Sequence, residues 1–333
     1  MTRTSPIACA ALAAALAAAA HADTTLYGSL RLSVDYIDDQ TLDQDYSDVR
    51  DNASRLGVKG SEELGGGLSA VYQYEFGVDA ANTGNTKGRL AWVGLKGGFG
   101  ALSLGRQWSP YYNAVGSLSD VWNSDDTAIG YYFLGQPHRI SNALIYASPD
   151  WRGFSAQLAL APDSDALGDS GLTGQVRGDS PAEEDDVDLW DLALLYQSGP
   201  FKAGVAYRDN RSADYSLWGA SASYAFADLN LIATYQQADL GSSEPWEADL
   251  TAEYRFGNNI LRAGYARLDT DAPVADRGSE TEFDIWKLGW QYNFSRRTRV
   301  FVEYADNEIA TGGGFLPFGA EYDNLSVGMR HDF

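Results

Sequence analysis

Hydrophobic and polar residues alternate along most of the chain, in segments of about ten residues. In residues 68–79, for example, Ala70, Tyr72 and Tyr74 alternate with the polar Gln73 and Glu75. A period of two places apolar side chains on one face of a strand and polar side chains on the other. The pattern predicts an all-β fold of about sixteen strands, at residues 24–36, 53–62, 68–79, 87–96, 101–107, 139–148, 154–161, 188–197, 201–209, 217–226, 229–238, 246–256, 259–268, 283–294, 297–305 and 323–333.

The connections between these segments fall into two alternating classes. One class is short and mostly glycine-rich, as at residues 64–67, 97–100 and 257–259. The other class is long and often acidic, at residues 37–52, 108–138, 162–188, 269–282 and 308–322. In an antiparallel meander the two classes lie at opposite ends, so the ends face different surroundings. Outer-membrane barrels have this asymmetry. We therefore expect a transmembrane antiparallel β-barrel; a soluble β-sandwich shows the same alternation but gives no reason for two classes of connection.

Two further features favour the membrane interpretation. No apolar run after residue 22 exceeds about five residues, whereas a spanning helix needs about twenty, so membrane residence must come from strands. Aromatic residues also lie near the ends of many strands in the apolar phase, where lipid headgroups would sit. Examples are Tyr36, Phe76, Tyr207, Tyr254 and Phe294.

The first 22 residues are predicted to be a secretory signal peptide. An apolar run at residues 7–20 leads into Ala20-His21-Ala22, which is typical of a cleavage site. The run is too short and too rich in alanine to span a bilayer. The sequence therefore predicts cleavage after Ala22 and a single mature domain at residues 23–333.

Composition and motifs exclude several functions. The 46 acidic and 24 basic residues give a formal net charge of -22, which argues against binding nucleic acid through a basic surface. The only cysteine, Cys9, lies in the predicted signal peptide, which excludes disulfides and a thiolate nucleophile in the mature domain. Motifs of serine hydrolases, P-loop proteins and zinc proteases are absent. His138 and His331 are too isolated for a metal site. We expect no enzyme activity, no cofactor and no metal.

Several short stretches together resemble the trimeric general porins of Gram-negative bacteria. They are residues 23–28 (DTTLYG), 54–65 (SRLGVKGSEELG), 89–96 (RLAWVGLK), 104–106 (LGR), 139–146 (RISNALIY) and 327–333 (VGMRHDF). The resemblance covers essentially all of residues 23–333. It implies a sixteen-stranded barrel, a homotrimer in the outer membrane, and passive diffusion of ions and small hydrophilic solutes through separate channels.

Strand parity and the resemblance indicate residues that line the channel. Parity places five basic residues on the polar face: Arg31, Arg55, Lys59, Arg89 and Arg139. Three of them, Arg55, Arg89 and Arg139, match the family's basic cluster at the constriction. The resemblance implies that the third external loop, residues 108–138, folds into the barrel and places Asp120, Asp125 and Asp126 opposite this cluster. Opposed charges would then create a transverse field. For each inward arginine the alternative is an ion pair within the wall that has no special role.

The chain ends in Phe333, on the same strand face as Leu325, Val327 and Met329. By resemblance, this terminal aromatic residue is the signal read by the barrel-assembly machinery, although His331 replaces the Tyr more frequent two positions before the end. The resemblance also places lipid and lipopolysaccharide around the barrel. The acidic external loops are expected to be solvated; an acidic vestibule that enriches cations and divalent-ion bridging to lipopolysaccharide are the alternatives.

The sequence thus predicts an outer-membrane diffusion porin. Two alternatives stay open. One is a substrate-specific channel on the same barrel, for a sugar, dicarboxylate or phosphate. The other, of a different class, is a secreted β-sheet adhesin or lectin. Acidic loops and a basic constriction act in opposite directions, so the sequence does not decide between cation and anion selectivity.

Overall fold

The structure is a computed structural model that describes residues 22–40, 43–124, 134, 138–162, 187–211, 213–272, 279–308 and 321–333. The predicted signal peptide up to residue 21 lies outside the described residues, as do Asp125 and Asp126. Most of the connections at 162–188 and 308–322 also lie outside them. Within the described part of the chain, no helix has the length and apolarity needed to cross a membrane.

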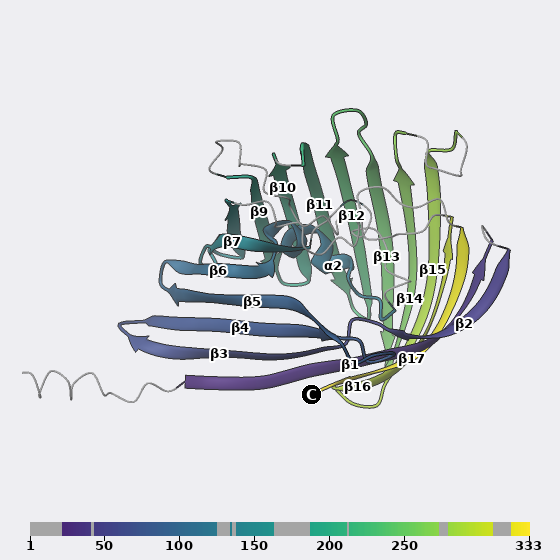
Figure 1. The fold of residues 1–333 in the computed structure, drawn as a ribbon, viewed down its shortest axis with the longest axis horizontal. Helices are drawn as coiled ribbons and strands as arrows, with labels where there is room; N and C mark the ends of the chain where they lie inside the picture. Colours follow the sequence, from purple (N-terminus) through teal and green to yellow (C-terminus); the bar gives the residue numbers. More distant parts are fainter. Residues whose placement is uncertain are drawn as a thin grey trace, which may run out of the picture.

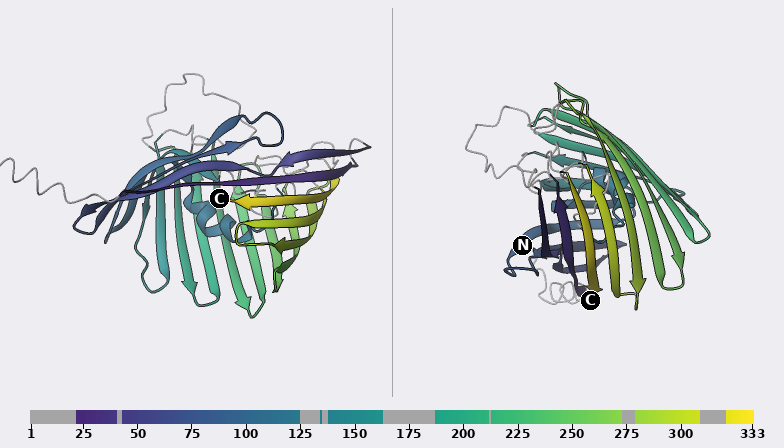
Figure 2. Two further views of the ribbon diagram at one scale, coloured as in Figure 1. Left: turned by 90° about the horizontal axis from the view of Figure 1, so that it is seen from below. Right: turned by 90° about the vertical axis from the view of Figure 1, so that its right-hand side faces the viewer.

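The described residues form one antiparallel sheet of seventeen strands, which curves around a common interior in Figures 1 and 2. The strands are β1 Ala22–Asp39, β2 Gln44–Asp51, β3 Arg55–Gly65, β4 Leu68–Val78, β5 Thr86–Gly97, β6 Gly100–Trp108, β7 Arg139–Ala147, β8 Phe154–Ala161, β9 Leu189–Ser198, β10 Phe201–Asn210, β11 Tyr215–Phe226, β12 Leu229–Asp239, β13 Trp246–Phe256, β14 Asn259–Asp269, β15 Glu282–Asn293, β16 Thr298–Asn307 and β17 Tyr322–Asp332. Each predicted strand coincides with one of these, with its ends shifted by three residues or fewer.

The sheet closes on itself. Strand β1 pairs with the last strand, β17, over eleven residue pairs. Strands β2 and β3 both pair with β1, along residues 32–39 and 22–29 respectively. They are two halves of one strand, interrupted near Ala53, which has a left-handed φ of 61°. Seventeen segments therefore make sixteen barrel strands, which confirms the predicted closed antiparallel barrel.

The prediction of a long loop at residues 37–52 is wrong. Strand β1 continues to Asp39, and a short turn leads directly into β2, so the two form a hairpin. The many acids of this segment suggested a solvated loop. Its apolar side chains nevertheless meet apolar partners on β1, because Val49 pairs with Val34 and Tyr46 with Ile37. Such cross-strand pairs favour strand over loop.

The strands present apolar side chains outward and mainly polar side chains inward. In β1, Leu30 and Val34 are 48% and 55% exposed, whereas Ser33 and Asp35 are buried. Exposed apolar residues continue this band around the barrel, among them Val93, Leu104, Leu194, Leu231, Leu250, Leu261, Leu288 and Val327. In a bilayer these side chains meet hydrocarbon, with about 0.8 kcal/mol gained for each CH₂ removed from water. Closure leaves no strand edge unpaired within the hydrocarbon layer.

Two short helical segments follow β6, namely η1 (Tyr112–Gly116) and α2 (Ser117–Ser119). They lie inside the curve of the sheet in Figure 1, where η1 contacts β9, β10 and β11, and α2 contacts β11 and β12. Small wall residues allow this approach. A Cβ atom at Gly204 would lie 2.1 Å from the Ala114 carbonyl oxygen, and the Ser221 hydroxyl donates to that oxygen at 2.7 Å.

A buried apolar cluster lies between these helices and the wall. It includes Tyr111, Val115 and Trp122 from the segment after β6, and Leu217 and Phe283 from the wall strands. Because part of the inner wall is apolar here, residues 109–124 are held by packing as well as by polar contacts.

Candidate functional site

The five predicted basic residues lie on four strands of one sector of the barrel. Arg31 is on β1, Arg55 and Lys59 are on β3, Arg89 is on β5 and Arg139 is on β7. The ring of Trp108 joins two of them, since the guanidinium carbons of Arg89 and Arg139 lie 5.9 and 4.6 Å from its centroid. Arg55 interacts electrostatically with Arg89. Lys59 lies instead over Tyr27, 5.2 Å from the ring centroid.

Arg89 is held in the wall by a buried ion pair. Its Nε donates to Glu75 Oε1 at 2.7 Å, and the two side chains are only 6% and 5% exposed. The Tyr27 hydroxyl donates to the other carboxylate oxygen at 2.8 Å. Buried charges need such pairing to offset the loss of hydration. Arg55 and Arg139 are partly exposed and lie more openly at the lining.

Asp120 is the one predicted acidic residue within the described ranges. The Tyr112 hydroxyl donates to Asp120 Oδ2 at 2.7 Å. The Tyr112 ring stacks on Trp108, with centroids 4.2 Å apart and planes 18° apart. Asp120 is exposed and interacts electrostatically with Arg55. The aromatic pair thus links the acidic residue to the tryptophan that contacts Arg89 and Arg139.

The beginning of the helical segment is anchored by Tyr111. Its hydroxyl donates to Gln236 Oε1 at 3.1 Å, and its ring lies 5.3 Å from the Arg208 guanidinium carbon. Arg208 donates to both oxygens of Asp191 at 2.6 and 2.9 Å, with both side chains fully buried. Burial raises the pKa of Tyr111 well above its usual value, so the hydroxyl stays protonated as a donor.

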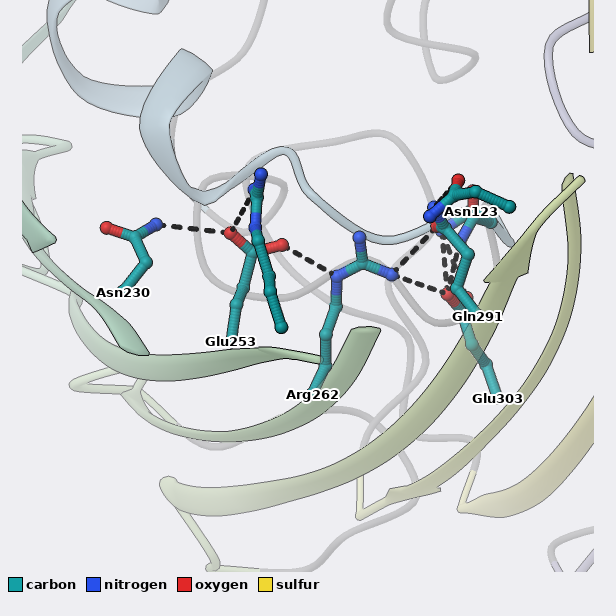
Figure 3. A network of polar contacts seen from close by, with 8 residues as sticks. Asn123, Asn230, Glu253, Arg262, Gln291 and Glu303 are labelled. Carbon is teal, nitrogen blue, oxygen red and sulfur yellow. Dashed lines mark hydrogen bonds and ion pairs between the residues drawn. The ribbon is translucent and has the colours of Figure 1, made fainter. Parts of the chain in front are cut away.

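The end of the segment is anchored by Glu303 on β16 (Figure 3). The Asn123 amide N–H lies 3.0 Å from both carboxylate oxygens, and the Ser124 N–H donates to Oε2 at 2.9 Å. The Asn123 side chain also donates to Oε1 at 2.8 Å. Glu303 is fully buried, and Arg262 lies 3.9 Å from it. Charge-assisted bonds of this kind are about twice as strong as neutral ones.

Residues 109–124 therefore leave β6, pass along β9–β12 and end against β16, all on the inner side of the barrel. Sequence reasoning missed the anchors, which are Asp191, Arg208, Arg262 and Glu303. It also missed two inward arginines, Arg299 and Arg330. Strand parity was the available signal, because each of these residues occupies the inward phase of its strand. The partners that each one contacts across the interior could not be predicted from the sequence. Among the described residues, no group of three or more His, Cys, Asp or Glu is arranged to hold a metal ion.

A closed barrel with an apolar exterior and a charged lining defines a membrane channel of the outer-membrane type. A sequence model of Gram-negative porins matches residues 8–311. The chain belongs to this family of Gram-negative porins.

Relatives of known family are similar to this chain along almost its whole length. The major outer membrane protein P.IB of Neisseria gonorrhoeae is 30% identical over 358 residues, which cover 96% of this chain and 97% of the relative. The corresponding protein of Neisseria meningitidis serogroup A is 29% identical, with the same coverage. The chain is thus an outer-membrane channel for passive diffusion, and a channel rather than an enzyme.

Solved structures show the same fold. An anion-selective porin from Comamonas acidovorans has a TM-score of 0.72 at 22% identity, covering 94% of this chain and 100% of the porin. OmpT of Vibrio cholerae, in its trimer form, has a TM-score of 0.69 at 16% identity, covering 94% of this chain and 99% of OmpT.

Proposed function

We propose that the third external loop, residues 108–138, folds inward and forms the constriction of the diffusion channel. The observation that carries this proposal is the anchoring of residues 109–124 at two sectors of the inner wall, through Tyr111 and Glu303. Asp120 lies between these anchors along the chain, and it is held by the hydrogen bond from the Tyr112 hydroxyl. In this proposal Asp125 and Asp126 add negative charge to the same loop.

The constriction would select by width and by charge. Arg31, Arg55, Lys59, Arg89 and Arg139 provide the basic side, and Asp120 with its acidic neighbours provides the other. Cations pass along the acidic side and anions along the basic side, and dipolar solutes are oriented by the field between them. Arg89 contributes least to this field because Glu75 neutralises it.

The proposal extends to export and assembly. Residues 1–22 would be removed after Ala22, leaving residues 23–333 as the barrel domain, which N-terminal sequencing of the mature protein tests. Three copies would form a homotrimer, as supported by the family and by the trimer form of OmpT from Vibrio cholerae. Phe333 would be read by the barrel-assembly machinery, and lipid with lipopolysaccharide would surround the trimer.

A second candidate is a channel on the same barrel that prefers anionic substrates. The inward arginines Arg299 and Arg330, added to the predicted basic cluster, favour it. The anion selectivity named for the Comamonas acidovorans porin is consistent with it. An adhesin or lectin receives no support from a family of porins.

Reversal potentials in a planar bilayer under a KCl gradient test the constriction. We expect Asp120→Asn, and likewise the pair Asp125→Asn and Asp126→Asn, to shift permeability toward anions by about twofold, since an exposed charge contributes up to about 1 kcal/mol. Arg55→Gln should shift it toward cations. The control is Asp150→Asn, in an exposed short turn between β7 and β8. Unchanged reversal potentials in all loop variants would show that the loop does not determine ion selectivity.

A further inference from the structure

Two irregularities in the strands lie beside arginines that contact one tryptophan, Trp108. In β5, Arg89 is an extra residue, because its two neighbours pair with consecutive residues of β4. In the β6–β7 ladder, two residues of β7 face a single residue of β6, starting two positions after Arg139. Such bulges change the direction of nearby side chains and are frequent next to functional sites. The guanidinium carbons of Arg89 and Arg139 lie 5.9 and 4.6 Å from the centroid of the Trp108 ring.

Trp108 lies at the base of the proposed constriction loop. It is the last residue of β6, and it pairs with Arg139, the first residue of β7. The third external loop therefore starts and ends beside this one indole. The Ser109 amide donates to the His138 carbonyl oxygen at 2.8 Å, which closes the base of the loop.

The same indole is connected to the acidic side of the constriction. The Tyr112 ring stacks on Trp108, with centroids 4.2 Å apart and planes 18° apart. The Tyr112 hydroxyl donates to Asp120 Oδ2 at 2.7 Å, and its amide donates to Ser109 Oγ at 3.0 Å. One ring thus contacts two arginines directly and an exposed aspartate through a single tyrosine.

The charged groups around Trp108 differ in how firmly the wall holds them. Arg89 is fixed by its buried ion pair with Glu75, at 2.7 Å. It gives the indole a neighbour that is held in place. Arg139 is partly exposed and Asp120 is exposed, so their positions depend more on the contacts that reach them from Trp108. Stacked aromatic pairs and cation–π contacts are each favourable beyond the area that they bury.

We propose that Trp108 is a positioning residue for ion selectivity, which fixes Arg139 directly and Asp120 through Tyr112. A charge on a mobile side chain is spread over many hydrated positions, so its field on a passing ion is weaker than that of a fixed charge. Locked side-chain conformations at a functional site come from packing of this kind. The inference rests on the proposed constriction, and it adds an uncharged residue to the groups that determine selectivity.

Reversal potentials of double variants in a planar bilayer test this role in the full refolded protein. Asp120→Asn and Arg139→Gln are measured in the wild-type background and in Trp108→Leu, which changes no charge. We expect shifts in permeability ratio of about twofold in the wild-type background to fall below about 1.3-fold in Trp108→Leu, because residues in contact are energetically coupled. Trp108→Tyr keeps a flat ring and should keep most of each shift. Arg139 and Tyr112 each have further interactions, so we expect the barrel to fold without the indole.

Tyr112→Phe separates the two sides of the stack. It keeps the ring on Trp108 but removes the hydrogen bond to Asp120. The shift caused by Asp120→Asn should shrink in this background, whereas the shift caused by Arg139→Gln should keep its wild-type size. This variant decides where Trp108→Leu does not fold, because an undiminished effect of Asp120→Asn in Tyr112→Phe overturns the proposal.

The matched control is Trp286→Leu on the outer face of β15. Trp286 is 58% exposed and also packs against a tyrosine, Tyr265, with ring centroids 4.4 Å apart. Both shifts should keep their wild-type size in this background. Shifts of equal size in the wild-type and Trp108→Leu backgrounds overturn the role of Trp108 and leave the constriction standing, as does an equal loss in Trp286→Leu. If neither Asp120→Asn nor Arg139→Gln shifts the wild-type reversal potential, the constriction itself is overturned, and this inference with it.

Discussion

One buried carboxylate, that of Glu303, anchors the end of the inner loop segment. It accepts hydrogen bonds from the backbone amides of Asn123 and Ser124. Glu303→Ala should destabilise the folded barrel by about 3 kcal/mol, because it removes the charged acceptor of two buried N–H groups. It should also increase open-channel current noise. Glu303→Gln keeps the shape of the side chain and one acceptor oxygen, so this variant should lose less stability than Glu303→Ala.

The measurements for Glu303 are single-channel noise and the temperature at which unboiled protein loses its folded gel band. Glu63→Gln is the control, because Glu63 is exposed near a short turn and accepts a hydrogen bond from the exposed Ser69 hydroxyl. Wild-type noise and stability in Glu303→Ala would show that packing at Trp122 suffices to hold the loop.

The sequence predicted which residues line the channel better than it predicted what each contacts. Arg31 and Arg55 follow from strand parity, since a period of two assigns the face directly. Arg89 has the phase of the exposed Val93 and Leu95, and it turns inward only because a β-bulge opposite Glu75 and Phe76 shifts the register there. Glu303 and Asn123 are separated by 180 residues, so their contact depends on barrel closure and on the path of the loop. Parity likewise gave no sign that Glu75 neutralises Arg89. The roles of Arg31, Arg55, Lys59, Arg89, Arg139 and Asp120 in selectivity stay predictions.

At the scale of elements, the position of η1 depends on a small residue in β10. A Cβ at Gly204 would lie 2.1 Å from the Ala114 carbonyl oxygen and 2.8 Å from its carbon, which is backbone that cannot rotate away. Gly204→Ala should displace η1 while the barrel still closes. We expect an altered single-channel conductance and a stability loss of about 1–3 kcal/mol, typical of overpacking. Gly88→Ala is the control, because nothing lies within 4 Å of its added Cβ. Wild-type conductance in Gly204→Ala would contradict the inference that close contact with Gly204 fixes the position of η1.

The strands could be predicted because lipid and water on opposite faces enforce a strict alternation. The hairpin at residues 37–52 was missed because its acids resemble those of a solvated loop. The structure shows why they cluster there: Asp45, Asp38, Asp323 and Asp306 pair in one outward row across β2, β1, β17 and β16. These positions lie beyond the apolar band, where strand pairing continues without hydrocarbon on the outer face.

This aspartate row predicts a stabilising substitution. Asp323 faces Asp38 on one side and Asp306 on the other. Opposed like charges cost about 0.2–1 kcal/mol per pair. Asp323→Asn should therefore raise the unfolding temperature of the detergent-solubilised barrel at neutral pH and low salt, and the gain should shrink in high salt. Asp228→Asn in the exposed β11–β12 turn is the control. A lower unfolding temperature for Asp323→Asn would indicate that the row is neutralised by a bound cation.

At the scale of the whole molecule, the barrel depends on one seam that joins the two ends of the chain. The eleven β1–β17 pairs form only when the last strand is present, so closure comes late in assembly. Sequence length and strand count predicted a single barrel in place of two domains. The registers and the tilt of the strands could not be predicted from the sequence, because they depend on the pairing of β1 with β17.

The chain terminus allows barrel stability to be separated from cellular assembly. Phe333 is bonded to Gly28 through its backbone in both directions at 3.0 Å, and its ring lies over Gly28 while remaining 44% exposed. Phe333→Ala keeps the backbone bonds, so the refolded barrel should lose no more than about 2 kcal/mol of stability. If the assembly machinery reads the ring, the amount of this variant in outer membranes of living cells should nevertheless fall several-fold. Phe294→Ala removes the same side chain from a turn at the same end of the barrel, where it is 63% exposed. Immunoblots of membrane fractions should show normal amounts of Phe294→Ala. A parallel fall in both variants, or in neither, would show that the terminal ring serves packing and lipid contact and not recognition.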